Sequence, residues 1–315
     1  MTRIRKIVPY PDTDRIRQLI LPGFQGVPVA EVVRFVAKGF KKGVLVTRAS
    51  SIAFNFLIAL LPSSFFLFTL IPFIPIPNFQ EELIEFFKYL MPETAFSFLE
   101  STIVDVITRK SGSLLLFMFG ATVIFSTNGI HALINAFVVS AHHFKSRTWF
   151  EQRKISLVLL AIIMTLIALA GGVLIIGKLI TTRMVELEII ESGALSYILR
   201  ALKSIVNLAL LFLAISFLYW LAPARRSEFR FFSPGSILAT LLFVITSLGF
   251  SAYVNHYGQF NKLYGSIGTL MIILIWLYLN SIALLIGFEL NVSIKAANAE
   301  MENNKQDANC SEDIS

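Results

Sequence analysis

Asparagine and histidine side chains occur inside stretches of this chain that are otherwise apolar. Asn128, His131 and Asn135 are spaced i, i+3 and i+7 within residues 112–139, so a helix would place all three on one face. Polar groups are costly in hydrocarbon and usually face a protein interior or a wet cavity. The chemistry that amides and an imidazole offer there is hydrogen bonding, and the pattern predicts a polar cavity.

Other polar residues are predicted to lie at a similar depth in the membrane. Asn55 lies about 10 Å past Arg48 at ~1.5 Å per residue, and His131 lies about 28 Å along a helix that starts near Gly112. We therefore predict a polar vestibule that is open to the cytosol and formed by the first, second and sixth helices. Its predicted lining is Asn55, Asn128, His131, Asn135, Asn280 and Asn291. The alternative is that these groups only join helices, at ~0.6 kcal/mol for each hydrogen bond.

The last apolar stretch has distinctive ends. If its helix begins near Gly265, Glu289 lies about 36 Å along it, beyond a ~30 Å hydrocarbon core. Glu289 is then a boundary residue that binds the connection from Arg147 to Arg153 or forms the vestibule rim with these two arginines. At the opposite end, a turn rich in tyrosine and glycine is a candidate for movement on the outer side. Its residues are Tyr257, Tyr264, Gly265 and Gly268.

Catalytic chemistry has little support in the sequence. It contains no HExxH, no paired carboxylates within an apolar run, no glycine-rich phosphate loop and no GxSxG. His142 and His143 are adjacent, so on a helix they diverge by about 100° and cannot converge on one metal ion. The single cysteine, Cys310, excludes an intrachain disulfide. We expect no enzymatic activity, no metal and no cofactor.

The composition of the chain is strongly apolar. The 315 residues are 56% hydrophobic and 15% charged, with a mean hydropathy of +0.73, which predicts a polytopic membrane protein. The net charge of +7 would suit nucleic acid, but the basic residues concentrate near the N-terminus and in short connections, as is typical of membrane topology. We expect membrane lipids as partners and no nucleic acid. Protein partners and the oligomeric state stay open.

The elements that position the polar groups are predicted to be six transmembrane helices in an all-α fold spanning residues 49–295. Apolar runs long enough to cross a bilayer occur at 50–72, 112–139, 155–177, 204–222, 233–254 and 265–290. Lysine and arginine are enriched before the first run and in the third and fifth connections, which predicts that both termini are cytoplasmic.

The remaining segments are predicted from their polarity. Residues 1–28 are a polar cytoplasmic tail, and residues 29–48 form an amphipathic helix that lies on lipid or packs on the protein's own cytoplasmic face. The long connection at residues 73–111 is predicted to contain short amphipathic helices that cover helix ends or gate a cavity. Residues 296–315 are a polar cytoplasmic tail that we expect to be disordered.

Two further groups of residues have predicted packing roles. Gly171, Gly172 and Ala168 are small enough to permit a close helix contact in the third span. Aromatic residues near span ends usually lie at the membrane interface. Those predicted here are Tyr219, Trp220, Tyr253 and Tyr257.

Several long motifs carry a family resemblance. The run LYWLAPARRSEFRFFSPGSILATLLFVITSLGFSAYVNHYGQFNKLYGSIGTLMIILIWLYLNSIALLIGFELN resembles the signature half of the YihY/BrkB inner-membrane family, formerly called ribonuclease BN. The runs SIAFNFLIALLPS and ALINA and the spacing of Arg147 and Arg153 fit the same family. The resemblance covers roughly residues 30–295. Two positions depart from it: His131 stands where an arginine-containing turn is frequent, and Phe288 stands where alanine is usual.

The resemblance implies a multi-pass protein of the bacterial inner membrane and envelope, for which transport or lipid export is the commonest suggestion. It also implies that the ribonuclease label is a misassignment. Together with the polar interior, it leads us to expect a transporter or translocase of a lipid or other amphiphilic solute. The alternative function is a non-catalytic membrane scaffold for envelope components.

Overall fold

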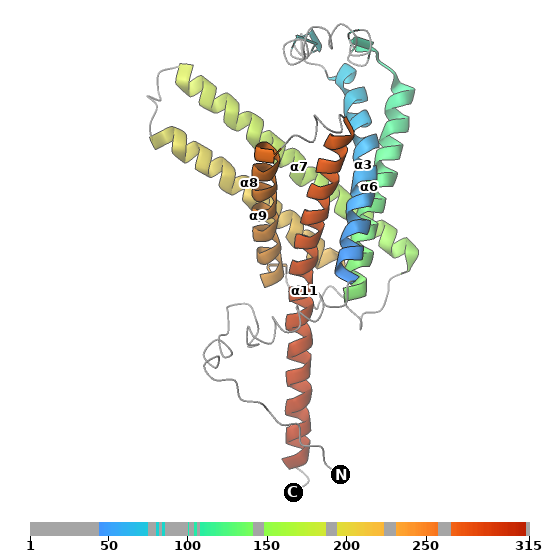
Figure 1. Ribbon diagram of the computed structural model, residues 1–315, viewed down its shortest axis with the longest axis vertical. Helices are drawn as coiled ribbons and strands as arrows, with labels where there is room; N and C mark the ends of the chain where they lie inside the picture. Colours follow the sequence, from blue (N-terminus) through green and yellow to red (C-terminus); the bar gives the residue numbers. More distant parts are fainter. Residues whose placement is uncertain are drawn as a thin grey trace.

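The computed structural model is built from long helices. It describes residues 44–74, 80–81, 84–85, 100, 104–105, 108–140, 148–186, 194–223, 231–257 and 266–312. The long helices are α3 (Val44–Leu70), α6 (Gly112–Ser140), α7 (Trp149–Glu186), α8 (Ala194–Leu221), α9 (Pro234–Tyr257) and α11 (Ser266–Glu312), and a short 3₁₀ helix, η1 (Ile71–Phe73), follows α3. Figure 1 shows their arrangement.

Six of the described helices are long and apolar enough to cross a membrane. The spans are Leu45–Phe73, Gly112–Val138, Trp149–Leu174, Ala201–Leu221, Pro234–His256 and Gly268–Ala296. The shortest of these has 21 residues, or about 31 Å of helix, which matches a hydrocarbon core of about 30 Å. The predicted all-α architecture with six apolar helices is confirmed.

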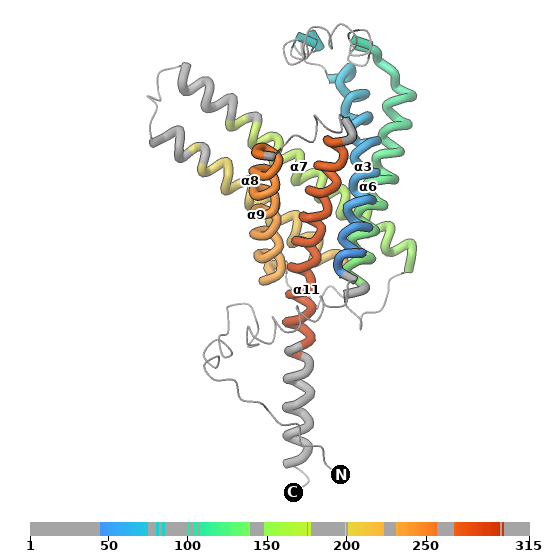
Figure 2. Tube along the Cα trace, in the orientation of Figure 1, coloured from blue at the N-terminus to red at the C-terminus, as the bar shows by residue number. Residues whose placement is uncertain are grey.

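The helices associate as pairs of sequence neighbours. α3 packs along α6, α7 along α8 and α9 along α11, and α11 also contacts α3. Figure 2 shows α11 between α9 and α3, whereas α7 and α8 run obliquely to these helices. α11 therefore links α9 to the α3–α6 pair.

Side-chain caps explain where two helices begin. The backbone N–H of Glu151 donates to Thr148 Oγ1 over 3.4 Å, and the backbone N–H of Thr148 donates to Glu151 Oε2 over 3.2 Å, which is a capping box for α7. Before α9, the backbone N–H of Ser236 donates to Ser233 Oγ over 3.1 Å. Pro234, the first residue of α9, has a fixed φ suited to that position and no N–H to leave unsatisfied.

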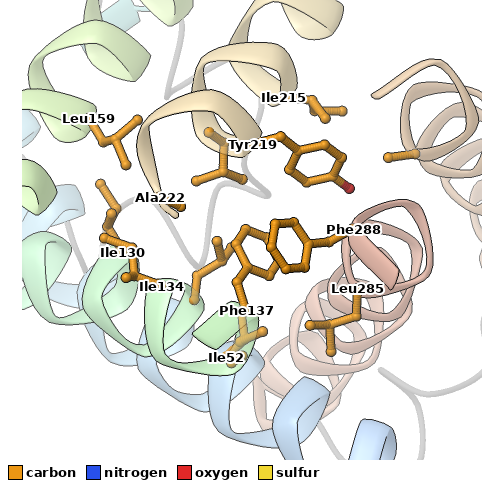
Figure 3. Packing of buried hydrophobic residues seen from close by; sticks show 14 of the residues in the cluster. Ile52, Ile130, Ile134, Phe137, Leu159, Ile215, Tyr219, Ala222, Leu285 and Phe288 are labelled. Atoms are coloured by element: carbon orange, nitrogen blue, oxygen red, sulfur yellow. The ribbon is translucent and has the colours of Figure 1, made fainter. Parts of the chain in front are cut away.

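The core lies where α6, α8 and α11 meet, as Figure 3 shows. The rings of Phe137 and Phe288 are stacked with centroids 4.1 Å apart, and Tyr219 meets Phe288 edge-on at 5.7 Å. Phe288 therefore fills the centre of the core. Tyr219 was predicted at the membrane interface, but it is 1% exposed. Its hydroxyl donates to the carbonyl of Leu284, so burial leaves no polar atom unsatisfied.

The closest helix contact is not at the predicted glycines. No heavy atom lies within 4 Å of where a Cβ on Gly171 or Gly172 would sit. A Cβ on Gly235 would instead lie 2.1 Å from the carbonyl oxygen of Gly287, and a Cβ on Gly287 would lie 2.5 Å from that of Gly235. Backbone meets backbone here, between α9 and α11.

The C-terminal segment is helical in the structure, and the N-terminal segment is largely outside the described residues. α11 continues to Glu312, so most of the predicted disordered tail at 296–315 is helical. Its sequence contains no proline or glycine and includes alanine, glutamate, lysine and glutamine, which favour continuation of the helix. The tail at 1–28 and most of the amphipathic helix at 29–48 lie outside the described residues. Much of the 73–111 connection does as well, so its amphipathic helices stay a prediction.

Candidate functional site: a polar pocket between α3 and α6

A pocket of about 420 Å³ lies between α3 and α6. Six of its eight lining residues are polar, although both helices are largely apolar. The lining consists of Arg48, Ser51, Asn55, Asn128, His131, Ala132, Asn135 and Ala136. We call this cavity the α3–α6 pocket.

The polar side chains of the two helices form matching rows. On α3 the row is Arg48, Ser51 and Asn55, and on α6 it is Asn128, His131 and Asn135, so each has the spacing i, i+3 and i+7. At one end, Arg48 Nη1 donates to the carbonyl of Ala136 over 3.3 Å. At the other, a Cβ on Gly129 would lie 3.7 Å from the carbonyl oxygen of Asn55. The rows are therefore antiparallel and face one pocket.

The rows run from one end of the spans toward their middle. Arg48 follows the start of the first span, Leu45, and Asn135 precedes the end of the second span, Val138; both lie about 5 Å inside at 1.5 Å per residue. By the same rise, Asn55 and Asn128 lie about 15 Å inside. The α3–α6 pocket therefore runs from near one end of the two candidate spans to about 15 Å inside them.

An ion pair connects the boundary end of the α3–α6 pocket to α11. Arg48 Nη1 lies 3.3 Å from Glu289 Oε1, and the two side chains are 14% and 13% exposed. Glu289 is not among the lining residues, and this pair connects it to the lining side chain of Arg48. The pair lets the position of α11 influence a lining side chain directly.

The middle of the α3–α6 pocket combines satisfied and unsatisfied polar groups. The amide of Asn55 donates to the carbonyl of Ser51 over 2.8 Å. His131 has a buried Nδ1 without a hydrogen-bond partner in the described part of the chain. Ser51 and Asn135 are exposed on the surface of the helix pair. The pocket thus offers hydrogen-bonding capacity and has an open side.

The structure brings four of the predicted vestibule residues together and places two elsewhere. Asn55, Asn128, His131 and Asn135 line the α3–α6 pocket, whereas Asn280 and Asn291 lie between α11 and α9. The sixth helix was predicted to line the vestibule with asparagine side chains. In the structure it instead contacts the pocket residue Arg48 through the ion pair with Glu289.

Asn280 and Asn291 are engaged in hydrogen bonds between helices. Asn280 Oδ1 accepts from Thr246 Oγ1 at 3.1 Å and Ser247 Oγ at 3.3 Å. Asn291 Oδ1 accepts from the backbone N–H of Gly235 at 2.9 Å, and its Nδ2 donates to Ser233 Oγ at 2.9 Å. These contacts correspond to the structural alternative in which polar side chains join helices.

The predicted rim and outer turn are only partly described. Arg153 lies on α7 with its guanidinium carbon 5.6 Å from the ring centroid of Trp149, while Arg147 lies outside the described residues. On the other side, Tyr257 ends α9 and Gly268 is buried near the start of α11. Tyr264 and Gly265 also lie outside the described residues, so movement of this turn stays a prediction.

Sequence reasoning missed Arg48 and Ser51 as pocket residues. Arg48 was assigned to the end of an amphipathic surface helix, whereas the structure includes it in α3. The available signal was spacing: Arg48, Ser51 and Asn55 repeat the i, i+3, i+7 pattern of the second span. Two such rows on consecutive, antiparallel spans indicate a shared polar seam.

Comparison with known proteins identifies the family. The sequence profile of the family described as Virulence factor BrkB matches residues 36–310. The chain belongs to the BrkB family. It is 26% identical to the ribonuclease-like protein YfkH of Bacillus subtilis (strain 168) over 78% of this chain and 88% of YfkH.

Other BrkB-family relatives are described as membrane proteins. A UPF0761 membrane protein of Prosthecochloris aestuarii is 26% identical over 83% of this chain and 60% of its own length. A UPF0761 membrane protein of Coxiella burnetii (strain Dugway 5J108-111) is 21% identical over 82% of this chain and 91% of its own length. No solved structure matches the chain. With its six apolar helices, this BrkB-family protein is a multi-pass membrane protein.

Proposed function

We propose that this BrkB-family protein is a transporter or translocase of a lipid or another amphiphile in the bacterial inner membrane, with both termini in the cytoplasm. The observation that supports this proposal is the α3–α6 pocket, in which six polar side chains line a cavity within apolar spans. A head group that crosses hydrocarbon without such partners loses its hydrogen bonds to water. The pocket supplies replacements over half the membrane depth.

The size and surroundings of the α3–α6 pocket favour an amphiphile. Its volume of about 420 Å³ falls in the range of small-ligand sites, roughly 300–1,000 Å³, so it accommodates a head group while acyl chains stay outside. Apolar side chains lie one helical turn from Asn128 on the same side of α6: Ile124 is 59% exposed and Phe125 is 39% exposed. Head group and chains thus each have a matching surface.

The mechanism that we propose is alternating exposure of this polar interior. The positive-inside pattern assigns the start of α3, and with it the boundary end of the α3–α6 pocket, to the cytoplasmic side. The Arg48–Glu289 pair ties this end to α11. A movement of α3 against α6, coupled to α11 through this ion pair, would therefore open or close the pocket while the α9–α11 contact stays intact.

Flux of a fluorescent phospholipid through proteoliposomes tests the proposal. The wild type should move the lipid between leaflets faster than protein-free vesicles do. The Asn128→Leu/His131→Leu variant should fall to the protein-free rate because the middle of the α3–α6 pocket becomes apolar. Thr165→Val is the matched control, because Thr165 is exposed on α7 and outside the pocket lining. Undiminished flux by a folded pocket variant would contradict the proposal.

A membrane scaffold is the second candidate. It is supported by α11, which continues from the end of its span at Ala296 to Glu312 and so provides a helix beyond the membrane for a protein partner. Truncation after Asn298 separates the two functions. A transporter of the proposed kind should retain lipid flux, whereas a scaffold should lose its cellular function while the membrane domain stays folded.

We also propose that the protein is not an enzyme and binds no nucleic acid. The distribution of basic residues near the N-terminus and in short connections, which is typical of membrane topology, supports this view. YfkH is named as a ribonuclease-like protein, so RNA is the substrate to test. The experiment is incubation of the purified protein with RNA and Mg²⁺. Cleavage that disappears in a point variant of this chain would overturn the proposal.

A further inference from the structure

We propose that the α3–α6 pocket binds the phosphate group of an anionic phospholipid through Arg48, with Glu289 as the internal competitor for the same guanidinium. This inference rests on the proposed function and specifies its substrate class. It is carried by the lining charges, the geometry of the ion pair and the depth of Arg48.

The lining of the α3–α6 pocket has the charge pattern of an anion site. Arg48 is its charged side chain, and none of its eight lining residues is acidic. The amide of Asn135 and the hydroxyl of Ser51 add hydrogen-bond donors at the same end of the pocket. A guanidinium surrounded by neutral donors suits phosphate, because its planar N–H groups match phosphate oxygens.

Glu289 reaches the guanidinium from outside the pocket. Arg48 Nη1 lies 3.3 Å from Glu289 Oε1 and 3.3 Å from the carbonyl oxygen of Ala136. Glu289 approaches from α11, outside the lining. A phosphate that enters from the α3–α6 pocket can therefore take the guanidinium without displacing a lining side chain.

Depth and exposure favour a lipid over a soluble phosphate. Arg48 lies about 5 Å inside the start of its span, so it is at the end of the pocket that is nearer to the lipid head groups. Ser51 and Asn135 at the open side are exposed, and the neighbouring Phe54 on α3 is 57% exposed. A polar opening beside an exposed aromatic ring in the spanning region fits a molecule with a phosphate and an acyl chain.

Binding to purified full-length protein in detergent tests this inference with three probes. Dioctanoyl phosphatidylglycerol carries both phosphate and acyl chains, dioctanoylglycerol lacks phosphate, and glycerol phosphate lacks acyl chains. The phospholipid should bind about 10- to 100-fold more tightly than dioctanoylglycerol, the contribution expected of hydrogen bonds to a charged group. Equal binding of these two probes would overturn the phosphate assignment. Glycerol phosphate that binds as tightly as the phospholipid would overturn the lipid assignment.

Variants of the ion pair identify the residue responsible. Arg48→Gln should remove the preference for the phospholipid, and Glu289→Gln should strengthen phospholipid binding because the competing carboxylate is gone. Arg48→Gln/Glu289→Gln leaves no uncompensated charge, so it keeps the test valid if Arg48→Gln fails to fold. Arg109→Gln is the matched control, since Arg109 is 73% exposed and pairs with Asp105 outside the pocket. An unchanged preference in the folded double variant would overturn the role of Arg48.

The same variants separate this inference from the proposed function. Arg48-dependent phospholipid binding without any lipid flux in proteoliposomes would support the binding site and contradict the transporter. Flux that continues at the wild-type rate in the double variant, and that is equal for phospholipid and dioctanoylglycerol, would support the transporter and overturn phosphate recognition.

Discussion

The two helix pairs that α11 connects use their asparagines in opposite ways. Between α9 and α11, Asn291 bonds to Gly235 and Ser233, at the beginning of α9. Between α3 and α6, Asn128 and Asn135 line a cavity of about 420 Å³. Both seams are antiparallel and contain asparagine at helical spacing. The first is closed by polar contacts and the second keeps polar groups available.

The groups that face the glycines differ between the two seams. In the α9–α11 seam, Gly235 meets Gly287 so closely that a Cβ on either would clash with the carbonyl of the other. In the α3–α6 seam, Gly129 faces the ring of Phe56, which lies 3.4 Å from the position of its absent Cβ. The closed seam contains a direct backbone contact, whereas in the open seam a ring faces the glycine. In this protein, asparagines in the spans therefore join helices or line a cavity according to what lies opposite them.

The largest effect should come from adding one methyl group to the closed seam. The Cβ of a Gly235→Ala variant would lie 2.1 Å from the carbonyl oxygen of Gly287. Because this oxygen belongs to the backbone of α11 and cannot turn away, the two helices must separate. We expect a loss of about 3 kcal/mol or more in the free energy of unfolding, at the upper end of overpacking effects. Thermal unfolding in detergent measures it.

Gly171→Ala is the matched control for that substitution. Nothing lies within 4 Å of its Cβ position, and alanine favours a helix over glycine by about 1 kcal/mol, so the melting temperature should stay the same or rise. Equal destabilisation by Gly171→Ala and Gly235→Ala would remove the backbone contact as the feature that distinguishes the two seams.

The next effect concerns the ion pair between the two seams. Arg48→Gln leaves the carboxylate of Glu289, 13% exposed, without this partner, and we expect a loss of about 2–4 kcal/mol in stability, slightly below that of fully buried pairs. The Arg48→Gln/Glu289→Gln variant removes both charges and should recover most of the loss. A double-mutant cycle from thermal unfolding measures the coupling, and additive losses would show that the pair does not link α3 to α11.

The sequence was sufficient for the helices and for four of the six polar lining residues of the pocket. Hydrophobic runs predicted the ends of the six spans to within six residues, because a bilayer demands long uninterrupted apolar helices. The face shared by Asn128, His131 and Asn135 was also predictable, because helical periodicity determines it without reference to any neighbour. Their pairing with Asn55 follows from consecutive spans being antiparallel.

Whatever depends on a partner helix was not predictable in the same way. Asn280 and Asn291 are asparagines within an apolar span, as the pocket asparagines are. Their partners, Thr246 and Ser233, become apparent only when the neighbouring α9 is placed beside α11. Tyr219 is an aromatic residue near a span end, as interfacial residues usually are, yet its hydroxyl donates a hydrogen bond to the carbonyl of Leu284 inside the core. Gly171 and Gly235 look alike in the sequence, and only the fold shows which one faces another backbone.

A smaller effect should distinguish the asparagines themselves. Asn291→Leu removes two hydrogen bonds at the start of α9, and we expect a loss of about 1–2 kcal/mol, the upper range for polar contacts between membrane helices. Asn128→Leu should change stability by no more than about 0.5 kcal/mol, since its side chain faces the α3–α6 pocket rather than a tight contact. Chemical denaturation in mixed micelles measures both, and a larger loss for Asn128→Leu would reverse the comparison.

The smallest effect on stability, and the sharpest test of the two seams, should come from single cysteines. In a Cys310→Ser background, Asn135→Cys places a thiol at the exposed side of the α3–α6 pocket, whereas Asn280→Cys places one where the residue is 4% exposed. A membrane-impermeant maleimide should label Asn135→Cys in inside-out vesicles and leave Asn280→Cys unlabelled. Labelling of Asn135→Cys only in right-side-out vesicles would reverse the proposed orientation. Protection of both thiols from both sides would mean that water does not reach the pocket, and a head group could then enter only from the lipid.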